Sequence, residues 1–162
     1  HFTQYNIGAS RAREGFARLA KQLAREGERE KALEMLDRGL EVLPTSKLRY
    51  SDSNTYPFIE GYYSIEEWEK GDKLLNDYLD TLIEYIEYYL QFDNMQAALV
   101  SSIIEEKMDS LMELYYLAAY AQRDDILSFM NDYLRTFGYT DDELIMPGTA
   151  PSEMLDIPAV DF

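Results

Sequence analysis

Carboxylates are almost the only side chains in this sequence with the reactivity that catalysis or metal binding needs. The 162 residues include 31 Asp and Glu, no Cys and a single His, His1. Without cysteine there is no thiolate nucleophile and no sulfur-ligated zinc. A histidine at the end of a chain is seldom held in place, which argues against acid–base catalysis by His1. A catalytic or metal centre would therefore have to be built from carboxylates.

The carboxylates do not show the spacing of such a centre. The acidic pairs Glu66–Glu67, Glu105–Glu106, Asp124–Asp125 and Asp141–Asp142 are sequence neighbours, and neighbouring side chains point apart on a helix. Asp52 begins a stretch similar to a calcium-binding loop, but Pro57 replaces its glycine and Tyr63 replaces its bidentate glutamate. We therefore expect no catalytic, metal-binding or cofactor-binding residues, and a chain that is not itself an enzyme.

The charge balance limits the classes of partner that the chain can bind. The 15 Lys and Arg leave a formal charge of −16, whereas nucleic-acid binding needs a basic surface. The longest uncharged stretches, such as residues 94–104, are far shorter than the roughly 20 apolar residues of a membrane-spanning helix. Because residue 1 is not Met, we expect the sequence to be part of a longer protein. We expect this part to be soluble, without nucleic-acid binding and without membrane contact of its own.

Apolar residues recur at helical spacing through most of residues 10–137, and no segment alternates as a half-buried strand does. Gly27, Pro44 and Gly138 are natural helix ends. These signals predict helices near residues 10–26, 28–43, 55–63, 67–91, 95–120 and 124–137. Charges at residues 105–109 would allow a break in the fifth helix. We expect an all-α fold of about six helices with an irregular C-terminal tail.

The first two helices carry small residues where helices could touch. Ala20 and Ala32 would let two helices approach closely, and Gly39 would leave room for the next one. The positions that match the 34-residue tetratricopeptide repeat, laid over residues 13–46, are Phe16, Leu19, Ala20, Leu23, Gly27, Ala32, Leu36, Gly39 and Pro44. This resemblance implies antiparallel helical hairpins stacked as an α–α superhelix, with Leu19 and Leu36 in the core.

A second, degenerate repeat is expected near residues 52–85. Its matching positions are Phe58, Ile59, Tyr62, Gly71, Leu75 and Tyr78. The helices of residues 94–137 no longer fit the pattern and would cap the array, because each repeat buries its apolar face only by stacking. The tetratricopeptide-like domain would thus occupy residues 1–137. Residues 138–162, rich in Pro and acids, predict either a loose tail or a strap lying on the helices.

Tyrosine is unusually frequent, with 14 residues. Packing in the core is one interpretation, and we expect it for Tyr78, Tyr85, Tyr89, Tyr115 and Tyr133. For Trp68 we expect a role as an anchor between helices. A binding groove is the other interpretation of the tyrosines. The first helix of each unit lines the concave side of tetratricopeptide arrays, so the resemblance implies a candidate groove formed by Lys21, Arg25, Tyr56, Glu60 and Tyr63.

The order of features also resembles one bacterial family. The segments FARLAKQLAREGEREKALEMLDRGLEVLP, GYYSIEEWEKGDKLLNDYL and IEYYLQF are similar to the soluble C-terminal region of large multi-pass membrane proteins related to protein O-mannosyltransferases. The resemblance covers residues 9–93 well and the remainder loosely. It implies that the parent protein is a candidate lipid-linked-sugar glycosyltransferase. It transfers no catalytic residue, because the catalytic acids of such enzymes lie in the membrane region.

The sequence therefore favours a non-catalytic helical-repeat scaffold that binds a protein or peptide. The resemblance implies that it is the soluble appendage of a membrane glycosyltransferase-like protein, on the extracytoplasmic (periplasmic) face of the bacterial inner membrane. The alternative is a carbohydrate-binding accessory domain that holds a glycan in a Tyr-lined groove.

Overall fold

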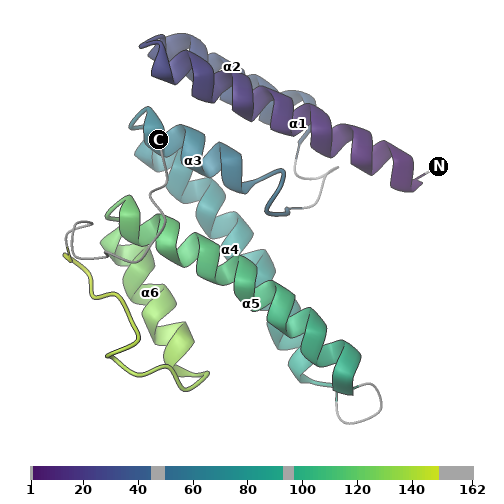
Figure 1. The fold of residues 1–162 in the computed structure, drawn as a ribbon, viewed down its shortest axis with the longest axis vertical. Coiled ribbons are helices and arrows are strands. Elements are labelled where there is room, and N and C mark those ends of the chain that lie inside the picture. The colour runs from purple at the N-terminus through teal and green to yellow at the C-terminus, as the bar shows by residue number, and fades with distance from the viewer. Residues whose placement is uncertain (1, 45–49, 93–96, 150–162) are drawn as a thin grey trace. The chain divides into compact units, whose positions relative to one another are not determined.

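A computed structural model of the chain describes residues 2–44, 50–92 and 97–149. These residues form the six α-helices of Figure 1 and contain no β-strand, so the expected all-α fold of about six helices is confirmed. The helices are α1 (Phe2–Arg25), α2 (Arg29–Val42), α3 (Tyr56–Ser64), α4 (Trp68–Leu90), α5 (Ala97–Tyr120) and α6 (Asp124–Arg135).

Two helices differ from the sequence-based prediction. Helix α1 begins at Phe2 instead of near Ser10, because this stretch contains no proline and its weakest helix former, Gly8, costs just about 1 kcal/mol in a helix interior. Helix α5 continues without a break through residues 105–109. Its acids there are exposed, and Lys107 lies 5.9 Å from the centre of the Tyr85 ring. The charges therefore stay at the surface and do not interrupt the helix.

The contacts divide the chain into two compact units, and the division falls within α4. Among the described residues, unit 1 lies within residues 2–81 and unit 2 within residues 82–149. The sequence pattern predicted a single boundary, between the helical domain that ends at residue 137 and the tail that begins at residue 138, where the composition changes. The long helix α4 gives no sequence signal of a division, because its helical pattern runs on from one unit into the other.

Unit 1 begins with the expected hairpin of α1 and α2, which lie side by side in Figure 1. Ala20 and Ala32 are both buried. Gly27 takes a φ of +80° in the connection, a conformation that glycine adopts without strain. The amide of Glu28 donates to the carbonyl of Leu23 over 2.9 Å, which closes the end of α1.

Helix α3 packs against this hairpin through glycine contacts. A Cβ atom at Gly39 would lie 2.8 Å from the Phe58 ring and 2.9 Å from Cβ of Phe16. At Gly61 it would lie 2.9 Å from Leu36. The space that the sequence assigned to Gly39 is thus filled by Phe58 of the following helix. The same kind of contact joins α3 to α4, where a Cβ at Gly71 would overlap the Tyr63 ring.

The prediction that Leu19 belongs to the core is wrong. Leu19 is 47% exposed, whereas Leu36 is buried as expected. The buried stripe of α1 consists instead of Ala9, Arg13, Ala17 and Ala20. Small side chains suffice there because α1 lies close to both α2 and α3. The periodicity suggested a buried stripe of large apolar residues that includes Leu19, whereas the stripe that packs in the structure consists mostly of alanines.

Unit 2 contains the last part of α4 together with α5, α6 and residues 139–149. Helices α5 and α6 pack against each other. Its buried apolar residues include Leu82, Ile86, Leu111, Leu114, Tyr115, Ala118, Leu127, Met130 and Leu134. Leu90 and Leu99, which the sequence placed in apolar stripes, are exposed. Of the five tyrosines expected to pack, Tyr78 and Tyr115 are buried, and Tyr85, Tyr89 and Tyr133 are partly buried.

Candidate binding surfaces

Arg13 is the one charged residue of the described chain that is completely buried. Its guanidinium donates to the carbonyl of Leu43, just beyond the end of α2, and over 3.3 Å to Oδ1 of Asn54. No described carboxylate lies within ion-pair distance of it, and its Nε has no hydrogen-bond partner in that part of the chain. Burial lowers the pKa of the guanidinium. The negative end of the α2 dipole offsets part of its charge, so Arg13 holds α1 to α2.

The candidate groove residues are only partly brought together. Lys21 of α1 and Glu60 of α3 form an ion pair with Nζ and Oε1 3.2 Å apart, and the Glu60 side chain is only 12% exposed. Arg25 is exposed on α1, and Tyr56 is half-buried at the start of α3. This ion pair connects the two helices that were expected to form the groove. The described contacts thus join Lys21 to Glu60 only, and we call these two residues together with Arg25 and Tyr56 the α1–α3 face.

Tyr63 does not belong to this face, which corrects the sequence-based assignment. It is 4% exposed, and its hydroxyl donates to Oδ1 of Asp72 over 2.8 Å. Its ring fills the space above Gly71 and lies 5.7 Å from the ring of Trp68. The large ring is drawn into the α3–α4 contact because Gly71 leaves room for it. Tyr63 therefore stabilises the hairpin.

A second surface, which sequence reasoning missed, follows the outer side of α1. Arg11, Gly15, Arg18, Gln22 and Arg25 are four and three residues apart in turn, a spacing that puts them on one side of a helix. The three arginines are exposed and form no ion pair with any described residue. With Leu19 and Lys21, the stretch from Gly15 to Arg25 borders a surface hollow. The seven-residue spacing of the three arginines was readable in the sequence, but the spacing alone does not show that they are exposed and form no ion pair.

A small cavity of about 240 Å³ lies on another side of unit 1. Its lining residues are Leu40, Pro44, Tyr50, Tyr62, Lys70, Lys73, Leu74 and Asp77. Both lysines are already paired, Lys70 with Asp37 and Lys73 with Asp77. The Tyr62 hydroxyl donates to Oδ1 of Asp37 over 2.9 Å, and burial together with this carboxylate raises the Tyr62 pKa. The cavity is thus apolar, with aromatic walls and a rim of neutralised charges.

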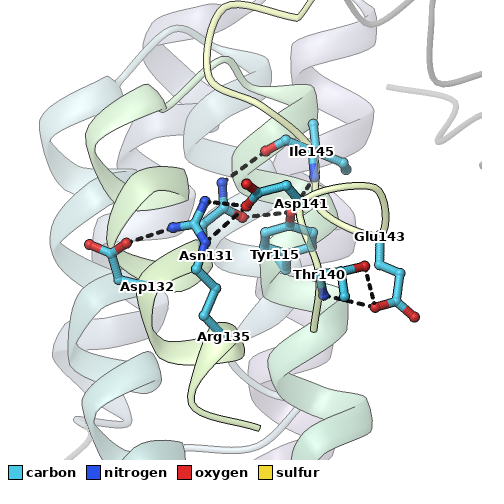
Figure 2. A network of polar contacts seen from close by, with 8 residues as sticks. All are labelled: Tyr115, Asn131, Asp132, Arg135, Thr140, Asp141, Glu143 and Ile145. Atoms are coloured by element: carbon cyan, nitrogen blue, oxygen red, sulfur yellow. Dashed lines mark hydrogen bonds and ion pairs between the residues drawn. The ribbon is translucent and has the colours of Figure 1, made fainter. Parts of the chain in front are cut away.

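In unit 2, a buried polar group holds the segment that follows α6 (Figure 2). The Tyr115 hydroxyl donates to Oδ1 of Asn131 over 2.7 Å and accepts the amide of Ile145 over 2.6 Å. The Asn131 amide donates to the Ile145 carbonyl over 3.0 Å. Two side chains thus satisfy both backbone groups of one residue, which we call the Tyr–Asn clasp. Burial raises the pKa of Tyr115.

Further contacts hold the same segment. Leu144 is buried, and the amide of Gly148 donates to Oδ1 of Asp124 over 3.0 Å. Arg135 lies between Asp132 and Asp141, as Figure 2 shows. The two hydrogen bonds of Thr140 to Glu143 lower the pKa of that carboxyl group. Residues 139–149 therefore lie on the helices as a strap, whereas residues 150–162 of the expected tail or strap are outside the described residues.

None of these surfaces has the donor set of a metal site. The described residues contain no group of three or more His, Asp or Glu placed to hold an ion. Within the same ranges no helix has the length and apolar character to cross a membrane.

Comparisons with known proteins give no relative. No protein-family model matches the chain, and searches of curated proteins and of solved structures find no similar protein.

Proposed function

We propose that this chain is a non-catalytic helical-repeat domain that binds a protein partner through the α1–α3 face. The packing of α1 and α3 in unit 1 is the observation that supports this proposal. Helices α1 and α3 pack side by side and are tied by the Lys21–Glu60 ion pair, while charged and apolar side chains such as Arg25 and Leu19 stay exposed beside it. A rigid pair of helices with an exposed mixed surface is a typical platform for protein recognition.

The tetratricopeptide-like register supports the proposal. Ala20 and Ala32 are buried, and Gly39 faces Phe58 of the next helix. These contacts are the ones that stacked hairpins need, because each hairpin buries its apolar face against its neighbour. The exposure of Leu19 is a departure from that register. The repeat assignment therefore remains part of the proposal.

The setting of the domain is also proposed. The resemblance of residues 9–93 supports a role as the appendage of a membrane glycosyltransferase-like protein, on the extracytoplasmic side of the membrane. In that setting the domain would bring a protein partner to the enzyme and would take no part in its chemistry.

A photo-crosslinking amino acid at Leu19 or Tyr56, in the full parent protein in its host, tests the proposal. We expect both positions to give an adduct with the same protein, identified by mass spectrometry. Arg38 on α2, which is exposed and paired with Glu41 of its own helix, serves as the control position. Adducts of equal yield from Arg38, or none from either test position, would contradict the proposal.

A carbohydrate-binding accessory domain is the second candidate, and the aromatic cavity favours it. Tyr50 and Tyr62 offer ring surfaces, and Lys73 and Asp77 offer polar groups at the rim. Apolar walls with a few polar groups are typical of small-ligand sites. Binding on a glycan array that is lost in Tyr50→Ala, but kept in Tyr56→Ala, would support this function. An array without binding, together with the crosslinked protein, would exclude it.

A further inference from the structure

We infer that the outer side of α1 docks an acidic segment of a partner protein, whose carboxylates pair with Arg11, Arg18 and Arg25. The inference goes beyond the proposed function, since the arginines of this surface share only Arg25 with the α1–α3 face. We call this surface the arginine stripe, and it consists of these three residues with Gly15 and Gln22 between them.

The spacing of the stripe fits a helical or regularly extended partner. Arg11, Arg18 and Arg25 are seven residues apart, so their Cα atoms are separated by about 10.5 Å along the helix axis. Seven residues turn the helix almost two full times, which leaves the three guanidinium groups within about 20° per step of one line. A partner helix with Glu or Asp every seven residues would place one carboxylate opposite each arginine.

The arginines are available for such contacts. All three are exposed, and among the described residues none of them has an ion-pair partner. Arg38, Lys70 and Lys73, by comparison, are exposed and paired with Glu41, Asp37 and Asp77. In a chain with twice as many acids as bases, three adjacent unpaired arginines are an exception that intramolecular pairing does not explain.

The distribution of charge along the chain favours an acidic partner. Residues 1–25 contain five Arg and Lys against one acid, whereas residues 26–162 contain 10 Arg and Lys against 30 acids. The stripe is therefore a local positive surface on a strongly acidic molecule. Complementary charge between two such patches speeds association and sets the orientation of the partner.

The surroundings of the stripe favour a protein over a lipid surface or a nucleic acid. A membrane or a duplex is a wide polyanion, which would also repel the remaining acidic residues of the chain. An interfacial helix would need an exposed apolar side, but Ala9, Ala17 and Ala20 of α1 are buried. One large apolar side chain, Leu19, is exposed beside the stripe, and a Cβ at Gly15 would meet nothing within 4 Å. A narrow acidic segment with one apolar residue would fill this space.

Two synthetic peptides of identical composition test the inference on the full chain. The first has Glu at every seventh position of a helix-forming sequence with Leu beside the central Glu, and the second has the same residues in scrambled order. Fluorescence anisotropy of the labelled peptides gives their affinities. We expect the first peptide to bind at least tenfold more tightly, and we expect its affinity to fall as salt rises, because exposed charge pairs are screened.

A variant with reversed charges in the arginine stripe tests whether these residues bind the peptide. The triple change Arg11→Glu, Arg18→Glu and Arg25→Glu should weaken binding of the first peptide at least tenfold. The control is the triple change Arg29→Glu, Lys31→Glu and Arg38→Glu, which alters the net charge equally at three exposed positions of α2. We expect the control to bind within about threefold of the unmodified chain. Circular dichroism establishes that both triple variants keep their helix content.

Several results would overturn the inference. These are equal affinity for the two peptides, equal loss in the two triple variants, tight binding to phosphatidylglycerol vesicles or duplex DNA in place of the peptide, and self-association of the chain that the stripe variant abolishes. If the Leu19 and Tyr56 crosslinks form while neither peptide binds the unmodified chain, the proposed function stands and the arginine stripe is excluded. If the crosslinks and the peptide binding are both absent, the proposed function fails as well.

Discussion

The two units of this chain are built from similar helices but are held together by different interactions. In unit 1, helices approach closely at glycines, and aromatic or branched side chains of a neighbouring helix fill the space above Gly39, Gly61 and Gly71. In unit 2, α5 and α6 also hold a non-helical strap through the Tyr–Asn clasp. The first kind of contact depends on the volume of one residue. The second depends on three hydrogen bonds that must all be made.

The difference explains why a repeat pattern describes one unit better than the other. Close contacts between helices require small residues, and these contacts recur at fixed positions of a repeat. The small residues therefore form a pattern that is visible in the sequence. A clasp formed by Tyr115, Asn131 and the backbone of Ile145 leaves no periodic trace. The sequence accordingly suggested helical packing for Tyr115 and gave no reason to single out Asn131.

The largest effect is expected in the core of unit 1. Leu36→Ala should destabilise the protein by about 2–5 kcal/mol, because Leu36 is fully buried and lies against Gly61. Leu19→Ala, the same change at a position that is half exposed, should cost less than about 0.5 kcal/mol. Denaturant unfolding of both variants measures the difference. Equal losses would mean that Leu19 is packed as the tetratricopeptide pattern predicts.

Unit 2 should be destabilised by the loss of the one hydroxyl group that forms the Tyr–Asn clasp. Tyr115→Phe leaves the Ile145 amide and the Asn131 oxygen without their partner, so it should cost about 1–3 kcal/mol. The control, Tyr116→Phe, changes an exposed residue and should have almost no effect. Hydrogen exchange followed by mass spectrometry should show faster exchange at Ile145 and Leu144. Unchanged exchange there would mean that the clasp does not hold the strap.

Several features of the fold could be predicted from the sequence. The ends of α2, α3 and α6 lie within about two residues of the predicted ends, because Gly27, Pro44 and paired acids act locally. The contact of Gly39 with the next helix was also predictable from the repeat. These features depend on neighbours in sequence or on a spacing that recurs.

Other features depend on contacts between distant residues, which periodicity does not reveal. Arg13 is buried although charged residues are almost always exposed, because the end of α2 places a carbonyl beside it. Tyr63 was assigned to a groove because of its position on α3, but its ring fills the space that Gly71 leaves open in the α3–α4 contact. The arginine stripe was visible as a spacing but gained meaning only when its residues proved exposed and unpaired.

Two glycines of unit 1 should respond to the same substitution with opposite sign. Gly39→Ala should destabilise by about 1–3 kcal/mol, because the new methyl group would overlap the Phe58 ring and Phe16. Gly15→Ala should stabilise by about 0.5–1 kcal/mol, because the space beside Gly15 is open and alanine favours a helix. Thermal or denaturant unfolding distinguishes the two. Stabilisation by both changes would contradict the close approach of α2 and α3.

The smallest effect that we expect is a loss of stability at alkaline pH, and it involves one tyrosine in each unit. Burial and the Asp37 carboxylate raise the pKa of Tyr62 in unit 1, and burial raises the pKa of Tyr115 in unit 2. A raised pKa means that the folded state keeps a proton that the unfolded state releases above about pH 10. Each of these tyrosines therefore contributes stability that is present below about pH 10 and is lost as the pH rises further.

The variant Tyr62→Phe isolates this contribution from the titration of the lysines. At neutral pH it should be less stable than the unmodified chain by about 1 kcal/mol, because the hydrogen bond to Asp37 is gone. Between pH 9 and pH 11 the unmodified chain should lose stability faster, so the difference between the two proteins should shrink. Urea unfolding across this range, with the exposed Tyr88→Phe as the control, provides the measurement. A difference that stays constant or grows with pH would mean that Tyr62 is not held by Asp37 in a buried setting.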